Sequence, residues 1–177
     1  MPYQVAVCGP RQCTEQDAEH AYRVGQLLAQ AGAVVLCGGG EGAMAAVAAG
    51  ARVAGGLVVG IRPNEDRSGS SPDLSVTVVT NMGEARNAII VWSADAVIAI
   101  GGSWGTLSEV ALAKRRGGIP VIVLGGWRIL DANGQSLPGI DYVETPDNAV
   151  ARAFGDQVGN DVRYRPQSAE RLPGFPT

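Results

Sequence analysis

Short apolar runs alternate with longer segments of helical periodicity along most of the chain. The runs are rich in Val and Ile, which is typical of strands buried on both faces. The expected strands are 5–8, 33–37, 57–61, 74–79, 97–100 and 119–124, with a short edge strand at 141–143. The expected helices are 15–31, 43–53, 83–92, 106–116 and 147–154. This alternation predicts a single Rossmann-like α/β domain, with a parallel sheet of about six to seven strands and helices on both faces.

The same pattern sets the expected limits of the domain. Residues 1–159 are expected to form a Rossmann-like nucleotide-binding domain without internal repeats or an interdomain linker. Residues 160–177 carry three prolines among polar residues, which predicts a poorly ordered tail. Residues 62–73 are polar and rich in Pro, Gly and Ser, which predicts a mobile loop between two strands.

Three glycine-bearing turns directly follow expected strands. They are Gly9-Pro10, 38–42 and 101–105. Glycine lets a backbone approach a ligand closely, and an open parallel sheet binds ligands at the carboxyl ends of its strands. We therefore expect the three turns to line one crevice, although each turn alone is also consistent with an ordinary strand–turn–helix joint.

The third turn combines an anion site with a carboxylate. A helix is expected to open at Gly105 or Thr106, and the free N–H groups at a helix start bind anions. Glu109 falls about one turn into this helix, on the same side as Gly105. Such a phosphate cradle with a neighbouring carboxylate suits a phosphorylated sugar or nucleotide.

Two residues of this cradle have alternative roles. Thr106 either gives a hydroxyl to the phosphate or caps the helix. Trp104 either stacks on a purine or pterin ring or forms an exposed aromatic rim. Glu41 would repel a phosphate placed in the 38–42 turn, so the glycines there are expected to admit the ring or the sugar of the ligand.

Composition narrows the possible partners. With 46% hydrophobic and 18% charged residues the chain is typical of a compact globular protein, and its net charge of −3 gives no basis for nucleic-acid or anionic-membrane binding. No signal peptide or apolar span is visible, and the three cysteines lack metal-ligand spacing. We expect a cytoplasmic protein whose Cys8 and Cys37 are buried free thiols.

Segments 5–9, 38–44 and 101–109 together resemble one known family, and the likeness runs in order from about residue 4 to 125. The family is the LONELY GUY (LOG) superfamily, older members of which were often labelled lysine decarboxylases. Its pattern P-G-G-x-G-T-x-x-E falls on 101–109. Its helix with M-x-x-R-K is similar to the segment from Met82 to Asn87.

The resemblance implies a Rossmann-like fold, a homodimer as the minimal unit and a nucleoside 5′-monophosphate site. Cytokinin-activating members are phosphoribohydrolases, which need no cofactor and cleave the N-glycosidic bond to release a free base and ribose 5-phosphate. The catalytic arginine and glutamate of the family fall on Arg86 and Glu109. Arg86 would contact the phosphate or the leaving base, and Glu109 would stabilise an oxocarbenium-like ribose. Their structural alternatives are a salt bridge for Arg86, to Glu84 or Glu109, and a solvated or helix-dipole residue for Glu109.

The chain also departs from the cytokinin-activating pattern. Gly101 and Ser103 replace the proline and the second glycine of the motif, and Asn87 replaces the lysine. The sequence of residues 83–87 is more similar to that of a sister branch, which includes molybdenum-cofactor carrier proteins. Two functions therefore stay open: a nucleoside 5′-monophosphate phosphoribohydrolase, or a carrier of molybdenum cofactor or a related phosphorylated pterin without turnover. AMP and molybdenum cofactor are the corresponding expected ligands.

The expected site and assembly follow from these turns and helices. Arg86 and Glu109 are the catalytic candidates, and no metal site is expected. The candidates for ligand binding are Gly9, Gly38, Gly39, Gly40, Gly42, Met44, Met82, Asn87, Gly101, Gly102, Ser103, Trp104, Gly105 and Thr106. Helices 43–53 and 83–92 carry apolar or small residues over much of their circumference, which predicts a homodimer or a larger homo-oligomer.

Overall fold

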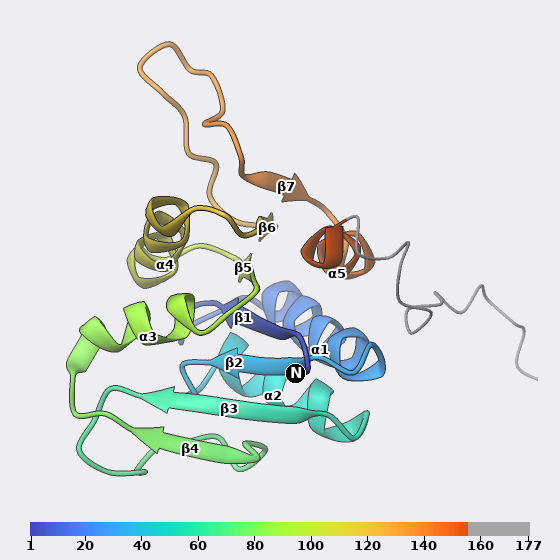
Figure 1. Cartoon of the computed structure of the whole chain (residues 1–177), viewed down its shortest axis with the longest axis vertical. Coiled ribbons are helices and arrows are strands. Elements are labelled where there is room, and N and C mark those ends of the chain that lie inside the picture. The colour runs from blue at the N-terminus through green and yellow to red at the C-terminus, as the bar shows by residue number, and fades with distance from the viewer. Residues whose placement is uncertain (156–177) are drawn as a thin grey trace, which may run out of the picture.

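A single parallel sheet organises the molecule. The structure, a computed structural model, describes residues 1–155, so the expected limit at 159 and the expected tail 160–177 lie outside the described residues. The strands are β1 (Gln4–Cys8), β2 (Val34–Cys37), β3 (Leu57–Arg62), β4 (Val76–Val79), β5 (Ala96–Ile100), β6 (Val121–Leu124) and β7 (Asp141–Val143). All six pairings are parallel, in the order β4-β3-β2-β1-β5-β6-β7 (Figure 1).

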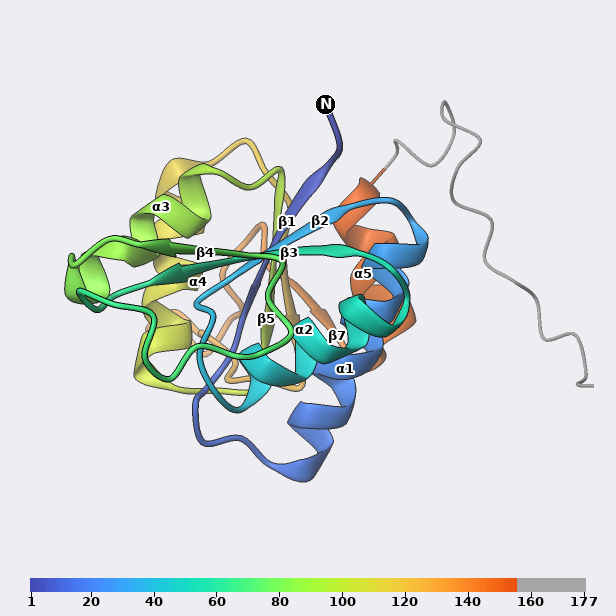
Figure 2. The ribbon, with the colours of Figure 1, turned by 90° about the horizontal axis from the view of Figure 1, so that it is seen from below.

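Helices cover both faces of this sheet. They are α1 (Glu15–Gln30), α2 (Ala43–Val53), α3 (Arg86–Trp92), α4 (Trp104–Arg116) and α5 (Pro146–Phe154), with a 3-10 turn η1 (Gly83–Ala85) before α3. Figure 2 shows α1, α2 and α5 on one side of the sheet and α3 and α4 on the other. Among the described residues no helix has both the length and the apolarity needed to cross a bilayer. The expected fold, a Rossmann-like α/β domain, is confirmed.

The apolar runs have no polar face because both faces of the central strands are buried. In β1, Val5 and Val7 pack into the cluster shared with α1, α2 and α5. Ala6 and Cys8 pack into the cluster shared with α3 and α4. Successive strand residues point to opposite faces, so each face needs its own apolar set.

Several predicted boundaries were wrong by a few residues. Strand β6 begins at Val121 rather than at residue 119, after Pro120, which has no N–H to give to the sheet. Strand β4 begins at Val76 rather than at residue 74. The helix expected over 83–92 opens as the 3-10 turn η1, and only then becomes α3.

The start of α4 also differs from the expectation. Ser103 is extended, at φ −155°, and its Oγ accepts a hydrogen bond from the Thr106 N–H at 3.1 Å. The helix therefore begins at Trp104, and Ser103 is the N-cap in place of Thr106. At α1 the N-cap is Thr14, which forms a reciprocal capping box with Asp17.

The strand order places the expected site. Strand β1 lies between β2 and β5, so the chain moves outward from β1 in both directions and the order reverses at β1–β5. The three glycine turns follow β1, β2 and β5, and they meet at one edge of the sheet. At such a switch point, open α/β sheets leave a crevice for a ligand.

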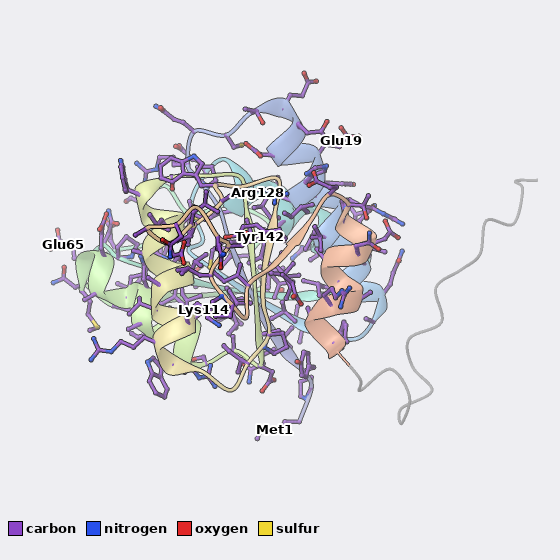
Figure 3. All side chains as sticks on the ribbon, turned by 90° about the horizontal axis from the view of Figure 1, so that it is seen from above. Met1, Glu19, Glu65, Lys114, Arg128 and Tyr142 are labelled. Atoms are coloured by element: carbon purple, nitrogen blue, oxygen red, sulfur yellow. The ribbon has the colours of Figure 1, made fainter. Side chains whose placement is uncertain are left out.

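The segment between β6 and β7 projects from the sheet as an arm (Figure 1). The Arg128 guanidinium lies over the Tyr142 ring at 5.3 Å, and the two side chains lie next to each other in Figure 3. Lys114 Nζ, on α4, donates to the Gly139 carbonyl at 2.8 Å. The arm is therefore tied both to β7 and to α4.

Candidate functional site

A cavity of about 330 Å³ lies at the carboxyl ends of the central strands. This volume is within the usual range of small-molecule sites. All three glycine turns contribute to it, together with the end of β3 and the η1–α3 segment. The predicted site residues that line it are Gly9, Gly38, Met44, Arg86, Asn87, Ser103, Gly105, Thr106 and Glu109.

The other predicted residues do not line this cavity. Gly101 and Gly102 border a much smaller apolar hollow of about 10 Å³ beside Trp127. A side chain on Gly101 would begin 2.8 Å from the Asp17 carboxylate, so this glycine makes room for α1 rather than for a ligand. The lining of the large cavity also excludes Gly39, Gly40, Gly42, Met82 and Trp104.

Arg86 and Glu109 face each other inside the cavity. Arg86 Nη1 lies 3.9 Å from Glu109 Oε1, and their side chains are 14% and 9% exposed. Arg86 comes from the start of α3 and Glu109 from the second turn of α4. The absence of a side chain on Gly38 leaves space for this pair, because a Cβ there would begin 2.6 Å from Arg86 Nη1. The salt bridge expected between Arg86 and Glu109 is therefore present, and both residues line the cavity.

Burial makes Glu109 a weaker acid than an exposed glutamate. Loss of solvent raises its pKa from 4.5 to about 7, although the nearby Arg86 cation and a hydrogen bond from the Cys8 thiol both favour the carboxylate. Glu84 adds a smaller upward contribution to this pKa. Near neutral pH Glu109 is therefore present in both protonation states, so it can act as carboxylate or as carboxylic acid.

Cys8 supports Glu109 from the end of β1. It is buried and free, and burial followed by the charge of Glu109 raises the pKa of its thiol well above the ordinary value. Burial raises the pKa of Cys37, on β2, to about 11. Both cysteines are thus buried protonated thiols, as expected, and Cys8 acts as a hydrogen-bond donor rather than as a nucleophile.

The start of α4 forms a second side of the cavity. Ser103, Gly105 and Thr106 line it, and the first N–H groups of a helix have no acceptor within the helix. The Thr106 and Ser103 hydroxyls lie 2.9 Å apart. Asn87 contributes a buried amide that donates to Ser108 Oγ at 3.2 Å. The geometry is that of an anion site at a helix start.

Sequence reasoning missed two arginines of the cavity. Arg62 was expected at the start of a mobile loop, but it is the last residue of β3 and is 3% exposed. Arg11 follows the first glycine turn and pairs loosely with Glu41 at 3.9 Å. A basic residue directly after a buried strand was the signal that could have found Arg62.

The cavity is consequently basic in a protein of net negative charge. Three arginines line it, Arg11, Arg62 and Arg86, against two glutamates, Glu84 and Glu109. The raised pKa of Glu109 reduces the negative side further. Within the described part of the chain, Arg86 Nε and Nη1, and Arg62 Nε, are buried without a hydrogen-bond partner. Buried donors without partners are costly and are typical of groups that wait for a ligand.

The exposed tryptophans and the histidine of the chain lie outside the cavity lining. Trp104 is 79% exposed and meets Trp127 edge to face, with ring centroids 5.2 Å apart. His20 is half-buried on α1, and its Nδ1 approaches Gly125. In residues 1–155 no three His, Cys, Asp or Glu side chains come together as a metal-binding group.

Fold and cavity together define a Rossmann-like protein with an arginine-lined cavity at its switch point. The chain belongs to the SLOG cluster4 family, whose model matches residues 2–150. It is 40% identical over 161 residues to an uncharacterized protein of Archaeoglobus fulgidus, covering 88% of this chain and 97% of that protein. This membership confirms the LOG-like resemblance noted in the sequence.

Solved structures agree with this family. The molybdenum cofactor binding protein of Rippkaea orientalis is 38% identical, with a TM-score of 0.76 over 85% of this chain and 94% of that one. The molybdenum cofactor carrier protein of Chlamydomonas reinhardtii is 28% identical, with a TM-score of 0.71 over 85% and 94%. DNA processing protein A of Helicobacter pylori, at 18% identity and a TM-score of 0.64 over 84% and 79%, shares the fold alone.

Proposed function

We propose that this protein binds molybdenum cofactor, or a related phosphorylated pterin, in the arginine-lined cavity and carries it without turnover. The observation that carries this proposal is the concentration of three arginines at one cavity in a chain of net charge −3. A phosphorylated ligand neutralises these charges, and the likeness to cofactor carriers supports a pterin as the rest of the ligand.

The cavity residues fit such a ligand. The unpartnered nitrogens of Arg86 and Arg62 are donors for anionic oxygens. The start of α4, with the Thr106 hydroxyl, is suited to the phosphate. Gly38 makes room for the Arg86 guanidinium and for Met44, because a Cβ there would begin 2.6 Å from Arg86 Nη1 and 2.7 Å from Met44 Sδ. Met44 gives the cavity an apolar wall on which a flat ring can pack. We expect the carrier to act in the cytoplasm as a homo-oligomer.

Retention of the cofactor tests this proposal. The protein is mixed with molybdenum cofactor and passed over a gel-filtration column, and molybdenum and pterin fluorescence are measured per chain. We expect near-stoichiometric retention by the native protein, and strong loss in Arg86→Met. Arg52→Met, which removes an exposed arginine on α2, serves as the control and should retain the cofactor. Equal retention by Arg86→Met and the native protein would exclude the cavity as the binding site.

The second candidate function is the phosphoribohydrolase. One observation favours it: a buried arginine and a buried carboxylate face each other at 3.9 Å in the cavity. In that reaction, ionised Glu109 would stabilise the positive charge on the ribose and orient the attacking water. Arg86 would stabilise the phosphate or the departing base. Release of adenine from AMP tests this candidate, and absence of release from AMP and from a cytokinin riboside monophosphate would reject it.

A further inference from the structure

Arg62 is a buried cation that forms no ion pair within the described residues. It lines the cavity at 3% exposure, its Nη2 donates to the Ser68 carbonyl at 2.9 Å, and its Nε has no hydrogen-bond partner in residues 1–155. In residues 1–155 four ion pairs lie within 4.0 Å, and none includes Arg62. A buried charge is expensive unless it is paired, so this side chain differs in kind from Arg86, which already faces Glu109.

The neighbouring charges do not neutralise Arg62. Burial lowers its pKa, and the cations Arg11 and Arg86 lower it further. Asp66 is the acid that acts on it, but the Asp66 carboxylate accepts both the N–H and the hydroxyl hydrogen bonds of Ser68, each at 2.9 Å. This end of the cavity therefore has an excess of positive charge.

Along the edge of the sheet, Arg62 and the start of α4 lie about two strands apart. Its Nη1 lies 3.0 Å from the point where a side chain on Gly40 would begin, so the guanidinium lies over the turn after β2. Helix α4 follows β5, and β2 and β5 are separated by β1. Two strand spacings are about 10 Å, which is more than a single phosphate spans.

We propose that Arg62 forms a second anion subsite, so that the natural ligand carries two anionic groups. One group, the phosphate, binds at the start of α4, and the other binds at Arg62. This inference rests on the proposed function and narrows its ligand class. A nucleoside 3′,5′-bisphosphate, whose phosphates are separated by the ribose, has this chemistry, and so does a pterin phosphate whose metal carries anionic oxygens.

Tungstate is the probe that tests this subsite independently of any ring. Crystals of the native protein soaked in tungstate should show two tungsten positions in the cavity by anomalous scattering, one beside Thr106 and one beside Arg62. Arg62→Met should lose only the second position, and Arg62→Lys should keep it because the charge remains. A single tungsten position shared by Arg62 and Arg86, or none at Arg62, overturns the inference. If crystals of the native protein show tungsten beside Arg62 but none beside Thr106, the result would instead contradict the proposed phosphate site.

Calorimetric titration gives the matching result in solution. The native protein should bind adenosine 3′,5′-bisphosphate, whose two phosphates are separated by the ribose, at least tenfold more tightly than AMP, since a second charge-assisted contact is gained. In Arg62→Met the two affinities should become equal, with the AMP affinity changed less than about threefold. Arg52→Met should preserve the native ratio. Equal affinities for AMP and adenosine 3′,5′-bisphosphate in the native protein contradict the second subsite, whereas tighter AMP than adenosine binding would still support the first.

Discussion

Glu109 combines two properties that are usually separate, because its carboxyl group lines the cavity and its side chain is also buried in the protein interior. The folded protein holds its proton more tightly than the unfolded chain does, since burial raises the pKa from 4.5 to about 7. Between these two values the folded state binds more protons, so the free energy of unfolding falls as the pH rises. The stability given by the protonated form is complete below pH 4.5 and lost by about pH 7.

Glu109→Gln should remove this pH dependence. Glutamine has nearly the same shape but no charge to desolvate. The free energy of unfolding of the variant should therefore rise by about 3 kcal/mol, relative to that of the native protein, between pH 5 and pH 8. Urea unfolding of both proteins at the two pH values measures the difference. A constant difference between variant and native protein across this range would mean that Glu109 keeps an ordinary pKa.

Arg86 and Glu109 should separate binding from chemistry. Arg86→Ala should weaken AMP binding, because the cation acts on the bound ground state. Glu109→Gln should change AMP affinity much less. If AMP is hydrolysed, Glu109→Gln should lower the rate by about 100- to 1000-fold, as expected when one electrostatic contribution to the transition state is lost. Turnover that survives Glu109→Gln unchanged would exclude Glu109 from catalysis.

Residue type was easier to predict than residue direction. Gly101 and Gly102 were expected to contact the ligand, but the structure turns them toward Asp17 and Trp127. Adjacent residues of an extended turn point in different directions, and only the packing of α1 and the arm decides which. Arg62 was missed for a similar reason, since its burial depends on neighbours distant in sequence.

At the scale of the elements, the start of α4 determines whether the cavity prefers phosphate. AMP at about 100 times its Kd should raise the Tm by roughly 5–10 °C, because ligand binding stabilises the native state by mass action. Adenosine, which lacks the phosphate, should raise it weakly or not at all. Thr106→Val keeps the shape of the side chain but loses the hydroxyl, so it should reduce the AMP shift. Equal shifts for AMP and adenosine would show that this helix start does not bind the phosphate.

Elements with a strong hydrophobic pattern were predicted correctly, but several of their ends were not. Helix α2 has the expected limits, and β7 was found despite its short length. The errors fall where local chemistry decides, as at Ser103, whose extended backbone moved the start of α4. The meeting of three glycine turns was predictable because parallel strands end at a common edge.

The whole molecule exposes more apolar surface than its two cores require. Edge strand β4 leaves Val76, Val78 and Val79 exposed, and Trp92 at the end of α3 is 64% exposed. Uncovered apolar edges favour pairing with another chain. This surface supports the expectation of a homo-oligomer.

Sedimentation at micromolar concentration tests that expectation. The native protein should sediment as a dimer or a larger species rather than as an 18.2 kDa monomer. Trp92→Lys should shift the equilibrium toward the monomer, since it places a charge in the apolar surface of α3. Leu137→Lys, in the arm between β6 and β7, is the matched control and should leave the assembly unchanged. Detection of only the monomer in the native protein would contradict the prediction.

The adjacency of β1 and β5 has a consequence during synthesis on the ribosome. Strand β1 emerges first, but its β5 neighbour follows roughly 90 residues later, which takes roughly 4 to 18 seconds at ordinary translation rates. Throughout that interval the nascent chain holds the central strand of the future sheet with one edge unpaired and one apolar face uncovered. Strand β1 thus waits longer for its second neighbour than any other strand of the sheet in residues 1–155, and chaperones that bind extended apolar segments have their longest opportunity there.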